Sequence, residues 1–316
     1  MNTIPLKEKL TDYLMMRKAL GFTTSRSKLI LESLVEYLER NVEKTSIPGQ
    51  VSIDWACNSS ARSGIPGQFS RLYLAKGFLT YLKTMFPDVQ IPDTSLIAAP
   101  VRSIPYVFSA EDLAKILSME IADSNLSIKL HTAQTLFALM ACTGLRPGEA
   151  IRLTIEDVEL NESPGLLKVN CSKYGKTRVV PVHQTTVAKL LDYLNWRQKT
   201  KPASLKDPFF VSTKGQQVKY QVLRRIFMKV IDKVELRASI GHLPPTLHSL
   251  RHTFAVQRVQ RWYEEGENAN ALMPNLAVYL GHAHIDGTYW YLSATPDLMA
   301  AAANLFEDYS KTGGVL

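Results

Sequence analysis

The sequence predicts a mainly α-helical protein of two domains, the second of which also carries a small three-stranded antiparallel sheet. Apolar residues recur at helical spacing through most of the first hundred residues. Prolines at positions 87, 92, 100 and 105 then interrupt this periodicity and indicate an extended linker. Beyond the linker, short β-like runs stand between further helical segments, an order that fits a helical domain with one small sheet.

The first domain, residues 1–90, is expected to consist of helices alone. Three amphipathic segments carry the helical pattern, and a shorter one lies between the second and the third: 4–20, 27–41, 69–86 and 52–61. The linker covers residues 91–105, and the second domain covers residues 106–316.

The second domain should open with a helix over residues 108–118, where Ser109 and Asp112 are spaced to form a capping box. An apolar helix and a short helix follow, over 131–144 and 145–153. Three strands are expected over 154–160, 166–170 and 177–182, and a polar turn, 171–176, joins the last two. The remainder reads as helices over 185–198, 220–234, 246–266, 275–282 and 296–311.

The overall composition favours a polyanionic partner and no membrane. The 316 residues carry a net charge of +8, and a basic surface attracts phosphate backbones. No apolar run approaches the roughly 20 residues of a membrane-spanning helix. The N-terminus lacks the features of a secretory signal, so a cytoplasmic location is expected.

The cysteines indicate neither a disulfide framework nor a zinc site. Cys57, Cys142 and Cys171 lie far apart in the chain, and no CxxC pair occurs. We expect them to be buried as small apolar residues.

Four local patterns carry side chains suited to chemistry on a phosphate. Arg146 lies in TGLRPGEA, directly after the apolar helix. Lys173 lies in SKYGKTRVVPV, in the predicted turn between two strands. His248 and Arg251 lie three residues apart in HSLRH, on one helix face. His282 lies in LGHAHIDGTYWYL, nine residues before Tyr291.

In these patterns and in their order, the chain resembles the tyrosine recombinase family, which includes the lambda-type integrases, the Xer proteins and Cre. The resemblance is detailed over residues 106–295 and architectural in the first hundred residues. It implies an N-terminal SAM-like helical core-binding domain that contacts DNA. It also implies a mostly helical catalytic domain with a three-stranded sheet, and the two domains would clamp a DNA duplex from opposite sides.

The resemblance implies a catalytic set, which consists of Arg146, Lys173, His248, Arg251, His282 and Tyr291, and a supporting pair, Glu149 and His252. Two alternatives stay open. Ser172 and Tyr174 replace glycines that commonly flank the hairpin lysine, which makes Lys176 a rival for Lys173. Tyr289 lies two residues before the expected nucleophile and is a rival for Tyr291.

These residue types suit the opening of a phosphodiester bond without a metal or other cofactor. A guanidinium is permanently charged and directs two N–H groups at a phosphate, so Arg146 and Arg251 can take the electrostatic role of a metal ion. A tyrosine phenol, with a pKa of about 10, can be activated as a nucleophile. A lysine can supply the proton that the leaving oxygen needs.

The resemblance therefore implies a site-specific recombinase that forms a 3′-phosphotyrosyl intermediate on double-stranded DNA, and we expect it to serve the integration or excision of a mobile element. Arg224, Arg225 and Lys229 are the side chains expected to contact DNA, mostly at phosphates. Four copies would assemble on two sites by exchange of the C-terminal helix, and Tyr291 would act in its own subunit or in a neighbouring one.

The sequence leaves three other functions open. One is a non-catalytic or accessory DNA-binding protein that keeps the fold, and another is resolution of chromosome dimers by an Xer-type enzyme. The third is a metal-dependent hydrolase that uses His248 with His252, or His282 with His284. The glutamate of an HExxH motif is absent, because Ser249 follows His248.

Overall fold

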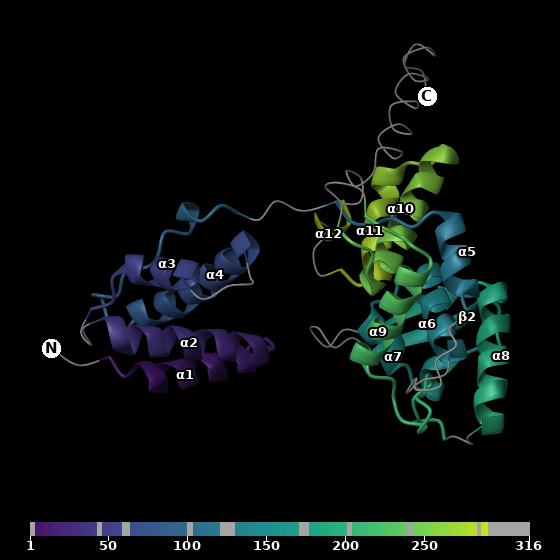
Figure 1. The fold of residues 1–316 in the computed structure, drawn as a ribbon, viewed down its shortest axis with the longest axis horizontal. Helices are drawn as coiled ribbons and strands as arrows, with labels where there is room; N and C mark the ends of the chain where they lie inside the picture. The colour runs from purple at the N-terminus through teal and green to yellow at the C-terminus, as the bar shows by residue number, and fades with distance from the viewer. Residues whose placement is uncertain are drawn as a thin grey trace, which may run out of the picture. The chain divides into compact units, whose positions relative to one another are not determined.

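In a computed structural model, the chain forms two structural units, Met1–Arg102 and Ser103–Leu316 (Figure 1). The structure describes residues 4–42, 46–58, 64–99, 104–120, 130–170, 177–200, 204–238, 243–282 and 286–289. The assignment of residues 1–90 to DNA binding and of residues 106–316 to catalysis stays a prediction at this point.

The first unit consists of helices packed on an apolar core. Its elements are α1 (Leu6–Ala19), α2 (Ser25–Asn41), α3 (Gly49–Asn58), α4 (Gly64–Lys83) and the short 3-10 helix η1 (Thr94–Leu96). The apolar face of α2 supplies Leu31, Leu34 and Leu38, which pack in one cluster with Phe78 and Leu79 of α4. Because these residues recur every three to four positions, the helical spacing in the sequence predicted the buried face.

The second unit contains the remaining helices and the sheet. Its helices before the sheet are α5 (Ala110–Ser118), α6 (Leu130–Thr143), α7 (Pro147–Arg152) and the 3-10 helix η2 (Ile155–Asp157). Its helices after the sheet are α8 (Gln184–Thr200), α9 (Tyr220–Lys233), α10 (Leu247–Glu264), α11 (Ala269–Leu280) and α12 (Asp286–Tyr289). Helix α6 is buried along much of its length, and α5, α8, α9 and α10 all pack against it.

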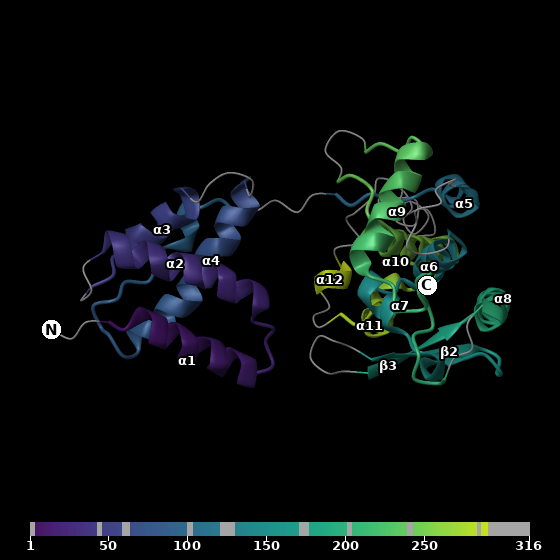
Figure 2. The same cartoon turned by 60° about the horizontal axis from the view of Figure 1, so that its bottom comes forward.

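The sheet has the order β1-β2-β3 and is antiparallel throughout. Its strands are β1 (Val158–Glu159), β2 (Gly165–Asn170) and β3 (Thr177–Val182). Figure 2 shows β2 and β3 along one edge of the second unit, with α7 and α11 close to β3. The ladder between β2 and β3 runs from Gly165 opposite Val182 to Asn170 opposite Thr177. The structure therefore describes this hairpin up to Asn170 on β2 and again from Thr177 on β3, on either side of residues 171–176.

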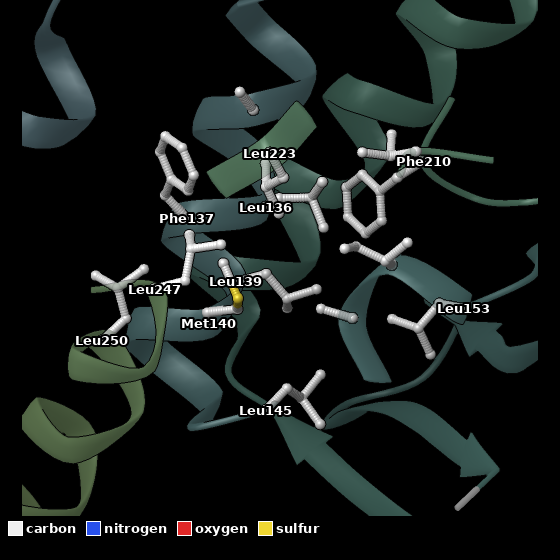
Figure 3. Close-up of a cluster of buried hydrophobic side chains, with 14 of the residues drawn as sticks. Leu136, Phe137, Leu139, Met140, Leu145, Leu153, Phe210, Leu223, Leu247 and Leu250 are labelled. Atoms are coloured by element: carbon white, nitrogen blue, oxygen red, sulfur yellow. The ribbon is translucent and has the colours of Figure 1, made fainter. Parts of the chain in front are cut away.

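The core of the second unit forms around α6. In Figure 3, the side chains of Leu136, Leu139 and Met140 on α6 lie among Leu223 of α9 and Leu247 of α10. All five side chains are buried. Close packing at this point holds α10 against α6, and thereby sets the position of the HSLRH residues at the start of α10.

Several predicted elements are confirmed, and some boundaries were wrong. Ser109 and Asp112 form the predicted capping box at the start of α5. The strand expected over 154–160 is wrong for most of its length, because Thr154 and Asp157 cap the 3-10 helix η2 there. The helix expected from residue 275 begins at Ala269, because the Asn268 side chain caps it and the helix tolerates a proline in its interior.

The expectation for the cysteines was also wrong where the structure describes them. Cys57 and Cys142 are exposed, and Cys171 lies outside the described residues. The terminal helix expected over 296–311 also lies outside them. Within the described part of the chain, none of the helices is both long and apolar enough to cross a bilayer.

Candidate active site

Arg146 immediately precedes helix α7, at the point where α6 has ended. Gly144 allows the tight connection, since its φ of +63° is strained for any other residue. A Cβ at this position would also lie 2.6 Å from the Phe254 ring. The Arg146 side chain is 33% exposed, so part of it is open to solvent.

The carboxylate of Glu149 is in direct contact with Arg146. It accepts a hydrogen bond from the Arg146 backbone N–H at 2.9 Å and another from Arg146 Nη1 at 2.8 Å. Arg178 of β3 donates to both oxygens of the same carboxylate, at 3.2 and 2.8 Å. Glu149 is buried between the two guanidiniums, with 3% of its side chain exposed.

Burial by itself would raise the pKa of Glu149. The hydrogen bonds and charge of Arg178, together with the hydrogen bonds from Arg146, outweigh the burial and lower the pKa to about 2. The carboxylate is therefore ionised at neutral pH. Its negative charge is shared between two arginines.

Arg251, on α10, is buried, with 1% of the residue exposed. Its Nη1 donates to the Gly144 carbonyl oxygen at 2.8 Å, and its Nη2 donates to the Leu280 carbonyl oxygen at 2.8 Å. These bonds tie the start of α10 to the ends of α6 and α11. A guanidinium can be buried in this way because carbonyl oxygens take up its donors.

The two predicted arginines converge on the C-terminal end of α11. Arg146 Nη1 lies 3.5 Å from the Leu280 carbonyl oxygen, the atom that also accepts from Arg251. Arg146 Nη2 donates to the Gly281 carbonyl oxygen at 2.9 Å. Residues separated by more than a hundred positions in the sequence thus place two guanidiniums around one peptide oxygen.

The three predicted histidines lie beside these arginines. His248 and His252 are one turn apart on α10, with ring centroids 5.0 Å apart. His282 follows the left-handed Gly281 cap of α11, and its Nδ1 lies 2.6 Å from the Thr288 hydroxyl oxygen. The structure therefore brings together Arg146, Glu149, His248, Arg251, His252 and His282.

Burial and the nearby guanidiniums disfavour a positive charge on all three imidazoles. Desolvation, followed by the charges of Arg251 and Arg146, lowers the pKa of His282 to about 3. Desolvation and the neighbouring His248 lower the pKa of His252 to about 4. The pKa of His248 is lowered by desolvation of its inner side and by Arg251 and Arg146, although the residue also reaches solvent. Neutral imidazoles can accept a proton or donate a hydrogen bond at pH 7.

Lys173, its rival Lys176, His284 and Tyr291 lie outside the described residues. The rival nucleophile Tyr289 ends α12 and is 39% exposed. The predicted DNA-contacting residues Arg224, Arg225 and Lys229 are all on the exposed side of α9, opposite its buried residues.

The sequence interpretation missed Arg178 and Thr288. Arg178 was part of the motif SKYGKTRVVPV, but nothing in the motif showed that it would reach Glu149. Thr288 is buried and lies three residues before Tyr291, and only its contact with His282 distinguishes it. Spacing alone does not identify partners that meet from different elements.

The arrangement suits a phosphate group better than a metal ion. Two guanidiniums, of which Arg146 faces solvent, offer permanent positive charge, and adjacent imidazoles offer proton transfer. Among the residues that the structure describes, no group of three or more His, Cys, Asp or Glu side chains could hold a metal ion.

The comparisons with known proteins agree with this chemistry. Residues 107–297 match the phage integrase family. A Sinorhizobium fredii protein named as an integrase/recombinase, y4rB, is 32% identical over 307 residues, which cover 95% of this chain and 96% of the relative. The tyrosine recombinase XerC of Pelobacter propionicus is 27% identical over 68% of this chain and 63% of its own length.

Two solved structures share the fold. The Tn1549 transposon integrase in complex with a circular intermediate DNA has a TM-score of 0.68 at 17% identity, covering 94% of this chain and 99% of that one. The XerH recombinase bound to its difH substrate has a TM-score of 0.67 at 18% identity, covering 89% of this chain and 79% of that one.

We predict that the His252 and His282 rings stay neutral in the folded chain at pH values where histidines of the unfolded chain are already protonated. Their pKa values of about 4 and about 3 lie below the ordinary value of 6.5. The stability that these neutral rings contribute is complete above pH 6.5 and is lost as the pH falls through about 4 for His252 and about 3 for His282. An NMR titration of the imidazole Cε1–H signals measures this directly, with His252→Gln and His282→Gln to assign them. An inflection near pH 6.5 for either signal would contradict the prediction.

Proposed function

The chain belongs to the phage integrase family of tyrosine recombinases, and on that premise we propose that it cuts and rejoins DNA through Tyr291. It is a site-specific recombinase, and members of this family cleave and rejoin DNA strands. The residues that carry each step in this chain are assigned here as a proposal. The observation that carries it is the convergence of Arg146 and Arg251 on the Leu280 carbonyl oxygen, beside His248 and His282.

In the first step, the Tyr291 oxygen attacks the phosphorus of one strand and gives its proton to His248. The bond from phosphorus to the 5′ oxygen breaks, and that oxygen takes a proton from Lys173. The products are a 3′-phosphotyrosyl ester and a free 5′ hydroxyl. Rejoining reverses the same bonds with a 5′ hydroxyl as the attacking group, so it needs no nucleotide cofactor.

Each remaining group stabilises this reaction in a different way. Arg146 and Arg251 offset the charge that grows on the non-bridging oxygens in the transition state. His248 can take the tyrosine proton in its neutral form, and its lowered pKa favours that form. His282 donates from Nε2 to a phosphate oxygen when the Thr288 hydroxyl donates to its Nδ1, which the distance of 2.6 Å permits. His252 packs against His248 and supports its position.

The biological role that we propose is integration or excision of a mobile element. The two Sinorhizobium fredii relatives, each named as an integrase/recombinase, match at 32% identity over 94–96% of their length. The Xer tyrosine recombinases match at 27–28% identity over 59–67% of theirs. Resolution of chromosome dimers is the second candidate. A DNA substrate is consistent with the cytoplasmic location expected from the sequence. Residues 1–90 would form a second, helical domain that contacts the DNA.

The proposal predicts a covalent protein–DNA adduct that requires Tyr291 and no metal. The native chain first selects its half-site from a pool of random duplexes, and a nicked duplex with that sequence then serves as the suicide substrate. Loss of the short 5′-hydroxyl fragment prevents rejoining, so the adduct accumulates. We expect adduct in the presence of chelator with the native chain and none with Tyr291→Phe.

Tyr289→Phe is the matched control, since it removes the rival phenol and should leave adduct formation intact. Loss of the adduct in Tyr289→Phe and its persistence in Tyr291→Phe would move the nucleophile to Tyr289. Absence of any adduct with the native chain on its selected half-site would reject the catalytic proposal in favour of an accessory DNA-binding protein. Adduct formation that stops in chelator would support a metal-dependent enzyme instead.

We also propose that the exposed side of α9 contacts DNA phosphates through Arg224, Arg225 and Lys229. The double variant Arg224→Glu/Arg225→Glu should weaken binding to the selected half-site by at least about tenfold and flatten its salt dependence. The matched control is Lys115→Glu/Lys189→Glu, which reverses two exposed charges on α5 and α8. Equal affinities of the two double variants in a fluorescence anisotropy titration would reject this surface.

Assembly into a tetramer through exchange of the C-terminal helix is the last part of the proposal. Lambda integrase has been solved as a tetramer bound to a Holliday junction, which is consistent with such an assembly here. A chain that ends after Thr295 should lose tetramer formation on paired sites in analytical ultracentrifugation. It should still form the covalent adduct on the suicide substrate. A truncated chain that assembles like the native one would contradict helix exchange.

A further inference from the structure

Three guanidiniums surround the C-terminal end of α11, and the third of them belongs to a residue without an assigned role. Arg178 Nε donates to the Tyr279 carbonyl oxygen at 2.8 Å. The next two carbonyl oxygens, of Leu280 and Gly281, accept from Arg251 and Arg146. The last carbonyls of a helix lack partners within the helix and form the negative end of its dipole. Three guanidiniums therefore bind at the C-terminal end of α11. The carbonyl oxygens of Tyr279, Leu280 and Gly281 each accept from at least one of them.

Glu149 connects Arg178 with Arg146. Both of its oxygens are bonded to both arginines, through Arg146 N and Nη1 and through Arg178 Nη1 and Nη2. Arg178 is turned inward, with 11% of its side chain exposed, while Arg146 is 33% exposed. The group of two arginines and one carboxylate keeps one net positive charge, and its solvent-facing member is Arg146.

Without Arg178, the buried carboxylate would have Arg146 as its one guanidinium partner in this group. A carboxylate and a guanidinium in contact form a neutral pair, and the interaction is strong where solvent is excluded. Arg146 would then be held toward Glu149 and would present little net charge to a phosphate. Arg178 prevents this because it donates a hydrogen bond to each oxygen of the carboxylate and supplies a second positive charge.

We propose that Arg178 is a positioning residue for the strand-cleavage reaction, because it satisfies Glu149 and the end of α11 so that the charge of Arg146 remains available to the scissile phosphate. The inference rests on the proposed function and extends it to a residue that does not touch the substrate. Arg178 acts through Arg146, and its effect should appear in the chemical step.

The position of Arg178 in the hairpin gives it a second connection. It stands opposite Val169, one ladder pair from the Asn170–Thr177 end of the described sheet. Lys173 belongs to the segment that follows Asn170 and precedes Thr177. The bonds from Arg178 to α7 and α11 therefore hold the described end of the hairpin, which is next to the Lys173 segment in the sequence.

The Arg178 guanidinium packs closely against the C-terminal cap of α11. Gly281 has a φ of +68°, and a Cβ built on it would lie 2.6 Å from Arg178 Nη1. The cap of α11 is thus in close contact with the guanidinium, directly before His282. A displacement of Arg178 would be transmitted to Gly281 and to His282.

The test measures the single-turnover rate of adduct formation on the suicide substrate at saturating enzyme. Arg178→Gln should lower this rate roughly 100-fold, the scale expected for misplaced catalytic groups. Arg178→Lys keeps the charge but lacks the planar fork, so its rate should lie between those of the native chain and Arg178→Gln. Arg237→Gln is the matched control, because it removes an exposed arginine that pairs with Asp232, and its rate should stay within about twofold of native.

The decisive variant is Arg178→Gln/Glu149→Gln. Removal of the carboxylate charge frees Arg146 again, so the double variant should react at least about tenfold faster than Arg178→Gln alone. A residue that served the fold alone would give the opposite result, since a second buried substitution would add to the damage. Thermal unfolding of each variant accompanies the rates, and Arg178→Lys replaces Arg178→Gln if the latter does not fold.

A second readout does not depend on DNA chemistry. The pKa of Glu149, about 2 in the native chain, should rise in Arg178→Gln, as followed by carboxyl ¹³C NMR. An unchanged pKa, a native rate in Arg178→Gln, or a double variant no faster than the single one would each overturn the inference. If the native chain forms no adduct, the proposed function itself fails. If Arg178→Gln forms the adduct at the native rate, the proposed function stands and the inference about Arg178 fails.

Discussion

The buried carboxylate of Glu149 is the constraint on which the described site depends. A desolvated negative charge must be paired, and Glu149 is paired with two guanidiniums and one backbone N–H. Those bonds join α7 to β3, two elements that approach only in the tertiary fold. They also hold the Arg146 side chain in one orientation, as the proposed role of this arginine in cleavage would require.

The end of α11 is the complementary feature. Its three last carbonyl oxygens hold Arg178, Arg251 and Arg146, so a helix terminus that would otherwise need solvent or a polar cap is satisfied by cations. The cations in turn lower the pKa values of the neighbouring imidazoles, since they disfavour a further positive charge. One arrangement thus provides both a cationic place for a phosphate and neutral histidines for proton transfer.

Local sequence signals predicted the elements well where one physical effect dominates. The capping box of Ser109 and Asp112 fixed the start of α5, and the apolar spacing of Leu31, Leu34 and Leu38 fixed the buried face of α2. Prediction failed where effects compete. The run from Thr154 has the composition of a strand, yet its polar ends cap a 3-10 helix. Helix α11 was expected from residue 275, yet it begins at Ala269 behind the Asn268 cap and contains Pro274.

The sequence by itself determined the mainly helical class with its small sheet and the family, and it supplied the proposal for the reactive residues, because each of these follows from motifs and periodicities that are local in the chain. Only the tertiary structure decided that Glu149 is shared by Arg146 and Arg178 and that Thr288 meets His282. The physical reason is that such contacts join side chains from elements distant in sequence, and their geometry is set by the packing of α6, α10 and α11 rather than by residue spacing. Residue spacing predicts which side chains take part, and tertiary packing decides which of them are in contact.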